Sequence, residues 1–206
     1  MIKNTRILAL LLTFLTTTSV FPQTYSFENS KVPDNWKIDK GAINATGDKY
    51  KAGKQSLQIK WEQGAVLTLT TPNGLSEACK SRNGGISTWI YNESPTEEPM
   101  IFFFKDSKGK EVCQLPFLLN FKGWRCIWAK FQNDMNMSAK STISTVELHF
   151  PQHTSKGVTY IDLLEFTPRV SWQNMSDAQY KVNRTDHSLI PDFIGYRNTK
   201  PQTDKV

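Results

Sequence analysis

From Ser56 onward the chain consists of short segments in which apolar and polar residues alternate. Leu57, Ile59 and Trp61 are separated by polar residues, and this period of two is typical of a half-buried β-strand. Seven further apolar runs follow at similar intervals, at residues 65–70, 86–91, 100–105, 112–119, 123–131, 146–150 and 158–166. The pattern therefore predicts a domain built from many short strands.

Turn signals separate these runs. They contain glycine, asparagine or proline and lie at residues 72–74, 83–85, 107–109 and 122–123. Such residues supply the tight or positive-φ positions that short connections between strands require. No segment of the folded part has a convincing helical period and no repeat is found. An all-β fold with little helix, either an antiparallel sandwich or a barrel, is expected.

Two of the predicted strands are apolar on both faces, at residues 101–104 and 124–131. A free two-layer sandwich normally has one polar face on each sheet. We therefore expect a cover over the second face: a folded-back loop, another domain, or a glycan that packs on aromatic rings.

The first 23 residues have the pattern of a signal peptide. They contain Lys3 and Arg6, no acidic residue, and an apolar run at residues 7–15, as in secretory leaders. This run is too short for a membrane-spanning helix, and no later segment is apolar enough to be one. We predict a secreted protein without a membrane span, in the periplasm or outside the cell.

The net charge is modest. It is +6 for the whole chain, and without the two basic residues of the leader it becomes +4. Such a weak excess favours anionic partners but is too small to indicate nucleic acid. An exported protein meets sulfated or uronic-acid glycans more readily than DNA, and no nucleic-acid partner is expected.

The three cysteines, Cys79, Cys113 and Cys126, allow one disulfide at most and leave a thiol over. Their spacing has neither a CxxC pair nor a histidine at zinc-ligand spacing. Cys113 and Cys126 lie in apolar runs, where buried and unreactive thiols are expected.

Six segments, in order, resemble the N-terminal domain of chondroitin sulfate ABC lyases. They are QSLQIKW at 55–61, ISTWIYNE at 86–93, NFKGWR at 120–125, Asn133-Asp134, Tyr160-Ile161-Asp162, and DAQYKV at 177–182 within the segment 172–184. Single pieces occur in many sugar-binding sandwiches, but the ordered set is much more specific. The similarity spans nearly all of the chain after the leader.

The resemblance implies a galactose-binding-like jelly roll of two bent antiparallel sheets at residues 24–168. Residues 169–206 would then form a post-sandwich segment and a linker toward a catalytic domain. In that family the domain helps to hold glycosaminoglycan chains, while an α-helical toroid and later β domains carry catalysis. The expected function is a non-catalytic accessory domain that binds chondroitin or dermatan sulfate. Two alternatives stay open: the first part of an active lyase that cleaves by β-elimination, and a structural docking domain that never contacts glycan.

No catalytic group can be assembled from this chain. Eliminative cleavage of a uronate requires a base, an acid and a cation close together. The histidines are His149, His153 and His187. His149 lies on a predicted strand, where its imidazole either contacts an anionic sugar or is exposed on the surface without a specific function.

Glycan binding requires cations for sulfate and carboxylate groups, and aromatic faces for the C–H side of sugar rings. The candidates are Arg125, Lys60, Trp89, Tyr91, Trp128, Lys105 and His149. Arg125 is the best cation because its planar guanidinium can hold an oxyanion with two parallel hydrogen bonds. The alternative is a structural ion pair for Arg125 and core positions for the tryptophans. The alternation places Trp89 and Tyr91 on one face.

A calcium site is a further candidate, from a looser resemblance to sugar-binding jelly rolls. Those modules clamp the ion with an early Phe-Glu and a late Ile-Asp, which correspond here to Glu28 and Asp162. Carboxylate and carbonyl oxygens suit Ca²⁺, and the loop at 51–54 would supply carbonyls. The alternatives for Asp162 are a salt bridge or solvent exposure.

Overall fold

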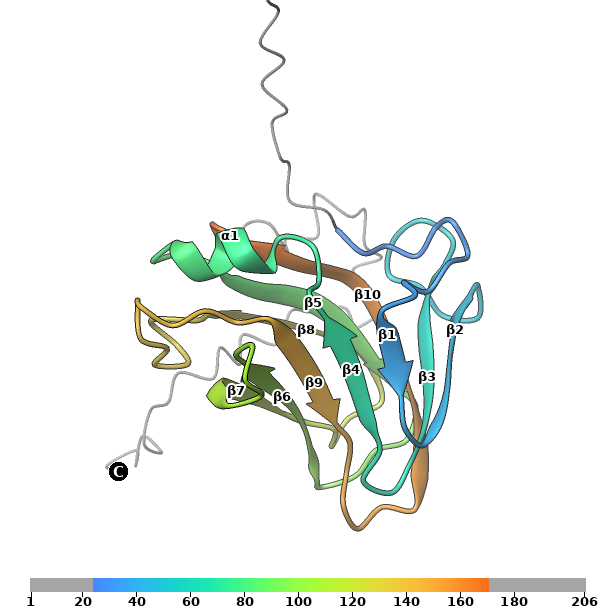
Figure 1. Cartoon of the computed structure of the whole chain (residues 1–206). Helices are drawn as coiled ribbons and strands as arrows, with labels where there is room; N and C mark the ends of the chain where they lie inside the picture. The colour runs from blue at the N-terminus through green and yellow to red at the C-terminus, as the bar shows by residue number, and fades with distance from the viewer. Residues whose placement is uncertain (1–23, 171–206) are drawn as a thin grey trace, which may run out of the picture.

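The computed structural model describes residues 24–170, which form ten strands and one short helix (Figure 1). The elements are β1 (Trp36–Ile38), β2 (Gly41–Thr46), β3 (Ser56–Glu62), β4 (Val66–Thr70), α1 (Leu75–Lys80), β5 (Gly85–Asn92), β6 (Pro99–Lys105), β7 (Glu111–Leu118), β8 (Gly123–Lys130), β9 (Thr145–His149) and β10 (Lys156–Thr167). The predicted signal peptide at 1–23, and residues 171–206 of the post-sandwich segment and linker predicted at 169–206, lie outside the described residues.

The strands form two five-stranded sheets, one in the order β1-β4-β9-β6-β7 and the other in the order β2-β3-β10-β5-β8. We call them the β9 sheet and the β10 sheet after their central strands. Every pairing between these named strands is antiparallel, and Figure 1 shows the sheets as two layers. The prediction of an all-β sandwich of two antiparallel sheets is confirmed.

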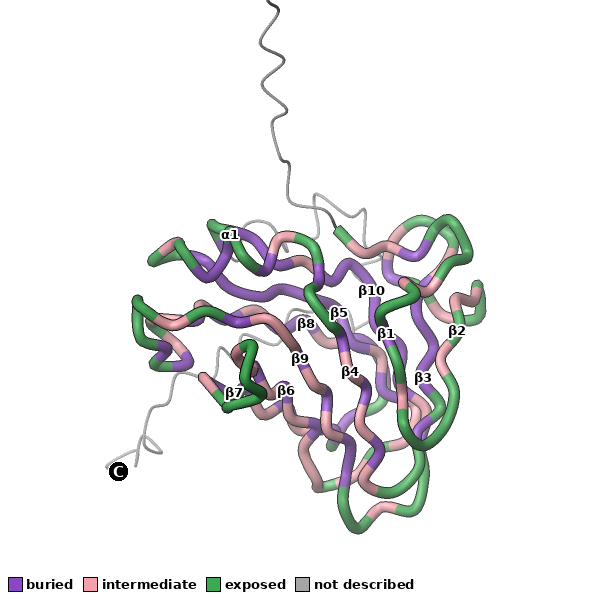
Figure 2. The backbone as a smooth tube through the Cα atoms, viewed as in Figure 1, coloured by how far each residue is buried: buried purple, intermediate pink, exposed green. Residues whose placement is uncertain are grey.

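The core lies between the two layers and follows from the alternation of the strands. On β6, Phe102 and Phe104 are buried while Phe103 and Lys105 between and after them are only half-buried. Figure 2 shows the same alternation along the strands. From the other layer, Trp61 on β3 stacks on Phe150 with a ring separation of 5.4 Å. A strand with this alternation, such as β6, presents one row of side chains to the core and one to the outside.

The helix α1 closes one end of the core. Its residues Leu75, Ala78 and Cys79 are buried, and they belong to the same hydrophobic cluster as the facing strands. The helix follows Gly74, whose φ of 80° is a left-handed conformation that glycine adopts without strain. In residues 24–170, no helix is long and apolar enough to cross a membrane.

Candidate functional site

One row of side chains crosses the outer face of the β9 sheet. The strand register places Lys37 opposite Thr68, Thr68 opposite Glu147, and Glu147 opposite Phe103. Gln114 on β7 completes the row, because it pairs with Phe103. Successive residues of a strand point to opposite faces, so these five side chains share the face turned away from the core.

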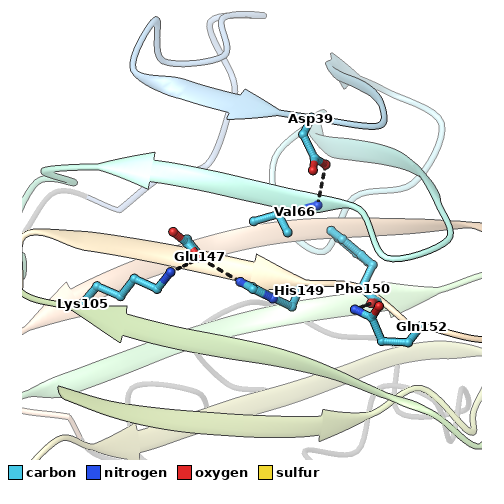
Figure 3. Close-up of polar contacts among 7 residues, drawn as sticks. All are labelled: Asp39, Val66, Lys105, Glu147, His149, Phe150 and Gln152. Carbon is cyan, nitrogen blue, oxygen red and sulfur yellow. Dashed lines mark hydrogen bonds and ion pairs between the residues drawn. The ribbon is translucent and has the colours of Figure 1, made fainter. Parts of the chain in front are cut away.

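Glu147 lies at the centre of this face and holds two neighbours. Its Oε2 accepts a hydrogen bond from Lys105 Nζ at 2.5 Å, and it lies 2.7 Å from Nε2 of His149. Figure 3 shows Lys105 reaching Glu147 from β6 and His149 reaching it along β9. The side chains of Lys105, Glu147 and His149 are 25%, 18% and 29% exposed. They are therefore within reach of a ligand but partly sheltered from water.

The carboxyl group of Glu147 is held in its charged form. Burial alone would raise its pKa, but the hydrogen bonds and charges of Lys105 and His149 outweigh that effect and lower the pKa below its usual value. The carboxylate therefore neutralises part of the positive charge on this face. An incoming anion has to compete with it for Lys105.

An aromatic pair adjoins this charged group. The rings of Phe103 and His149 meet edge to face, with centroids 4.5 Å apart, and Phe103 is half-buried. The face thus combines a partly exposed ring, cationic side chains and hydrogen-bonding groups within neighbouring rows. This combination suits a ligand that has apolar C–H faces together with hydroxyl and acidic groups.

The predicted aromatic candidates lie on the other sheet. Trp89 and Tyr91 do share one face, as the alternation predicted, and they cluster with Trp124, Tyr160 and the partly buried Trp128 on the outer side of the β10 sheet. Trp89 is fully buried, with the Lys51 ammonium 3.6 Å from its ring centroid. In this arrangement Trp89 packs against protein and presents no face to a ligand.

Arg125 does not join these aromatic residues. On β8 it alternates with Trp124 and Cys126, which belong to the outer cluster, and it pairs in register with the core residue Ile90. Its guanidinium carbon lies 4.2 Å from the ring centroid of Phe121. The structure therefore divides the seven predicted glycan-binding residues: Lys105 and His149 meet on the β9 sheet, Arg125 stacks on Phe121, and the other four lie on the outer side of the β10 sheet.

The two predicted calcium ligands converge on the loop between β2 and β3. Glu28 accepts hydrogen bonds from the backbone N–H groups of Lys54 and Gln55. The fully buried Asp162 accepts them from Lys51, Ala52 and its own neighbour Leu163. These N–H donors complement an anion and do not replace the oxygen ligands that Ca²⁺ requires. The contacts of these two carboxylates do not fit calcium, and the calcium site stays a prediction.

The cysteines are buried, as expected for Cys113 and Cys126, and all three are free thiols. Burial is the main cause that raises the pKa of Cys79 to about 11 and that of Cys113 to about 12. Such thiols are protonated at neutral pH and react slowly. Within residues 24–170, no group of three or more histidine, cysteine and acidic side chains is placed to hold a metal ion.

Comparison with known proteins identifies relatives. A family model described as "Lyase, N terminal" matches residues 22–182. The chain is 29% identical over 177 residues to a chondroitin sulfate ABC exolyase of Bacteroides thetaiotaomicron, covering 81% of this chain and 17% of that protein. It is 26% identical over 210 residues to a chondroitin sulfate ABC endolyase of Proteus vulgaris, covering 86% and 20%. The chain thus spans about a fifth of the length of these relatives.

Solved structures share the fold at low sequence identity. An exo-β-agarase matches with a TM-score of 0.54 and 12% identity, over 73% of this chain and 25% of that chain. A family 11 carbohydrate-binding module of Clostridium thermocellum, solved with a mixed-linked tetrasaccharide, matches with a TM-score of 0.51 and 13% identity, over 75% and 99%. At such identities the likeness concerns the β-sandwich alone.

Proposed function

The chain belongs to the family of lyase N-terminal domains, and on this premise we propose that it is a non-catalytic part of a lyase and binds a glycosaminoglycan, namely chondroitin sulfate or dermatan sulfate. The named curated relatives are chondroitin sulfate lyases, and the fold resembles that of a module solved with a bound oligosaccharide. The proposal includes export to the periplasm or the exterior, because residues 1–23 have the pattern of a leader.

One observation carries the binding role: the outer face of the β9 sheet. The register pairs Phe103 with Glu147, and it places Lys105 and His149 in the two neighbouring rows of the same face, where both contact Glu147. Lysine and protonated histidine attract sulfate and uronate groups, and an aromatic ring offers a surface for the apolar side of a sugar. A glycan laid across β4, β9 and β6 would meet Thr68, Glu147 and Phe103 in succession, with Lys105 and His149 on either side of this row.

The absence of catalysis by this domain is part of the proposal. β-Elimination requires a base beside a uronate whose carboxylate is neutralised by a cation. On this face His149 is instead paired with Glu147 at 2.7 Å, and the negative charge of Glu147 opposes a second carboxylate. We place the catalytic residues of the proposed lyase in the larger part of the relatives' length. Under the alternative docking function, the β9 sheet would not contact glycan at all.

Two substitutions with opposite expected effects on glycan affinity test this role. Lys105→Gln removes a cation from the face, so we expect about fivefold weaker binding of a chondroitin sulfate oligosaccharide. Glu147→Gln removes the competing carboxylate and is expected to strengthen binding by about the same factor. Titration calorimetry on the purified chain across a salt series measures both effects, which should shrink as salt rises.

Lys80→Gln is the matched control, because Lys80 is exposed on α1 and its loss changes the net charge as Lys105→Gln does. It should leave the affinity nearly unchanged. Equal losses for Lys80→Gln and Lys105→Gln would indicate unspecific attraction between charges. No binding by the unmodified chain, even at low salt, would favour the docking function.

A further inference from the structure

A hollow lies on the opposite side of the sandwich from the outer face of the β9 sheet, at one end of the β10 sheet. It has a volume of about 640 Å³ and is lined by Ala42, Lys60, Glu62, Ser94, Lys156 and Val158, among others. That size falls within the range of pockets that hold small ligands. None of its lining residues belongs to the outer face of the β9 sheet.

The strand register defines the floor of this pocket, which consists of two small apolar side chains with a lysine between them. Lys60 on β3 pairs with Ala42 on one side and Val158 on the other, so these three side chains form a row. Below them, the ring of Trp61 occupies the place of a side chain at Gly157, where an added Cβ would lie 2.1 Å from the ring. Trp61 is itself fixed by a hydrogen bond from its Nε1 to Thr159 at 3.0 Å. The fixed ring of Trp61 therefore makes the floor rigid, and the side chains of Ala42 and Val158 that line it are small.

Two ammonium groups belong to the pocket: that of Lys60 in the middle of this row and that of Lys156 at the start of β10. Lys60 and Lys156 are exposed, and neither has an ion pair among the described residues. Glu62 is the one acidic residue in the lining, opposite Lys156 in register. The pocket therefore carries an excess positive charge, which attracts sulfate or carboxylate groups.

Ser94 adds a directed hydroxyl group. Its Oγ accepts a hydrogen bond from the Val158 N–H at 3.1 Å, and a hydroxyl that accepts in this way keeps its own proton to donate. An acidic sugar can use all of these features together: its anionic group with the lysines, its hydroxyls with Ser94, and its C–H face with Ala42 and Val158.

We propose that this pocket, defined by Lys60, Lys156 and Ser94, is a second binding site for an acidic saccharide unit. The inference rests on the proposed function, since it assumes that the domain takes glycosaminoglycan. It goes beyond that function by giving the domain two contact sites on opposite faces. A long chain that reaches both sites, or two chains held at once, would be retained more strongly than a short oligosaccharide.

The test is an NMR titration of the ¹⁵N-labelled chain with a chondroitin sulfate tetrasaccharide. We expect two separate groups of shifted amide signals, one including Ser94 and Gly157 and one including Glu147 and His149. In the double variant Lys60→Gln/Lys156→Gln, the signals of the first group should lose most of their shift, while those of the second group should shift as before. The control Lys80→Gln should retain both groups, and the dispersion of the spectra shows whether each variant is folded.

The outcomes separate this inference from the proposed function. If the Ser94 and Gly157 signals do not move, or move equally in the double variant, the second site is refuted. If they move while the Glu147 group stays still, the second site stands and the role of the β9 sheet is refuted. If neither group moves, both proposals fall.

Discussion

Phe102→Ala is expected to lower the free energy of unfolding by about 4 kcal/mol, the usual cost of removing a buried phenylalanine. Phe102 is fully buried and pairs with Leu115 and Leu148 on the neighbouring strands, which belong to the same core cluster. Removing its ring would leave a cavity between the two sheets. Urea unfolding, followed by tryptophan fluorescence, measures the loss.

Phe103→Ala is the matched control for this prediction, since it makes the same chemical change one residue along the same strand. Phe103 is half-buried on the outer face, so its removal should cost about 1 kcal/mol and leave no enclosed cavity. Equal losses of stability in the two variants would contradict the assignment of Phe102 to the core and Phe103 to the outer face.

The second large effect concerns Asp162. Its carboxyl group is fully buried in a stretch of β10 where the register shifts between Asp162 and Glu165. Burial is the largest influence on this group and raises its pKa to about 7, although hydrogen bonds from Ala52, Lys51 and Leu163 act in the opposite direction. The folded protein therefore keeps this proton at pH values at which the unfolded chain releases it.

The stability that this proton contributes is fully present below about pH 3.8, the usual pKa of the group, and is lost as the pH rises to about 7. The loss amounts to about 4 kcal/mol at most, at about 1.4 kcal/mol for each unit of pKa shift. Asp162→Asn removes the titration. The unfolding free energy of the unmodified chain minus that of this variant should therefore decrease as the pH rises from 4 to 7. A difference that stays constant, or rises, across this range would contradict the prediction.

Most of the fold could be predicted from the sequence because apolar alternation records which side of a strand is buried. Eight strands, from β3 to β10, lie where the runs predicted them. The three elements that the sequence did not predict show little apolar alternation. β1 has three residues, β2 is exposed or half-buried along its whole length, and the six residues of α1 are too few for a helical period.

The site was harder to predict, because it depends on which residues of different strands become neighbours. The sequence singled out Lys105 and His149, but the side chain that joins them, Glu147, gave no signal of its own. Phe103 was noticed only as part of a run that is apolar on both faces. Periodicity divides a strand into two faces, but where both are apolar it does not say which one meets the core.

The same limit explains Trp89 and Arg125. An aromatic residue on a strand has the same pattern whether its face is open or covered, and Trp89 is covered by the Lys51 side chain. Arg125 has the right chemistry for an oxyanion but lies on the core side of β8, where it stacks on Phe121. The prediction that something covers a second apolar face fits the run at 124–131 in the β10 sheet, where Lys51 and Ala52 of a loop pack on the aromatic cluster. For the run at 101–104 on β6, the outer side chains Ile101 and Phe103 are only half-buried among the described residues.

The central claim is that glycan binds across the outer face of the β9 sheet, and Phe103→Ala tests it most directly. Tyr50→Ala is the control, because Tyr50 is the one large apolar residue that is clearly exposed in residues 24–170, at 47%. With a chondroitin sulfate oligosaccharide in titration calorimetry, Phe103→Ala should raise Kd about tenfold, or about 1.4 kcal/mol. Tyr50→Ala should leave Kd unchanged. An unchanged Kd for a folded Phe103→Ala variant would contradict the claim.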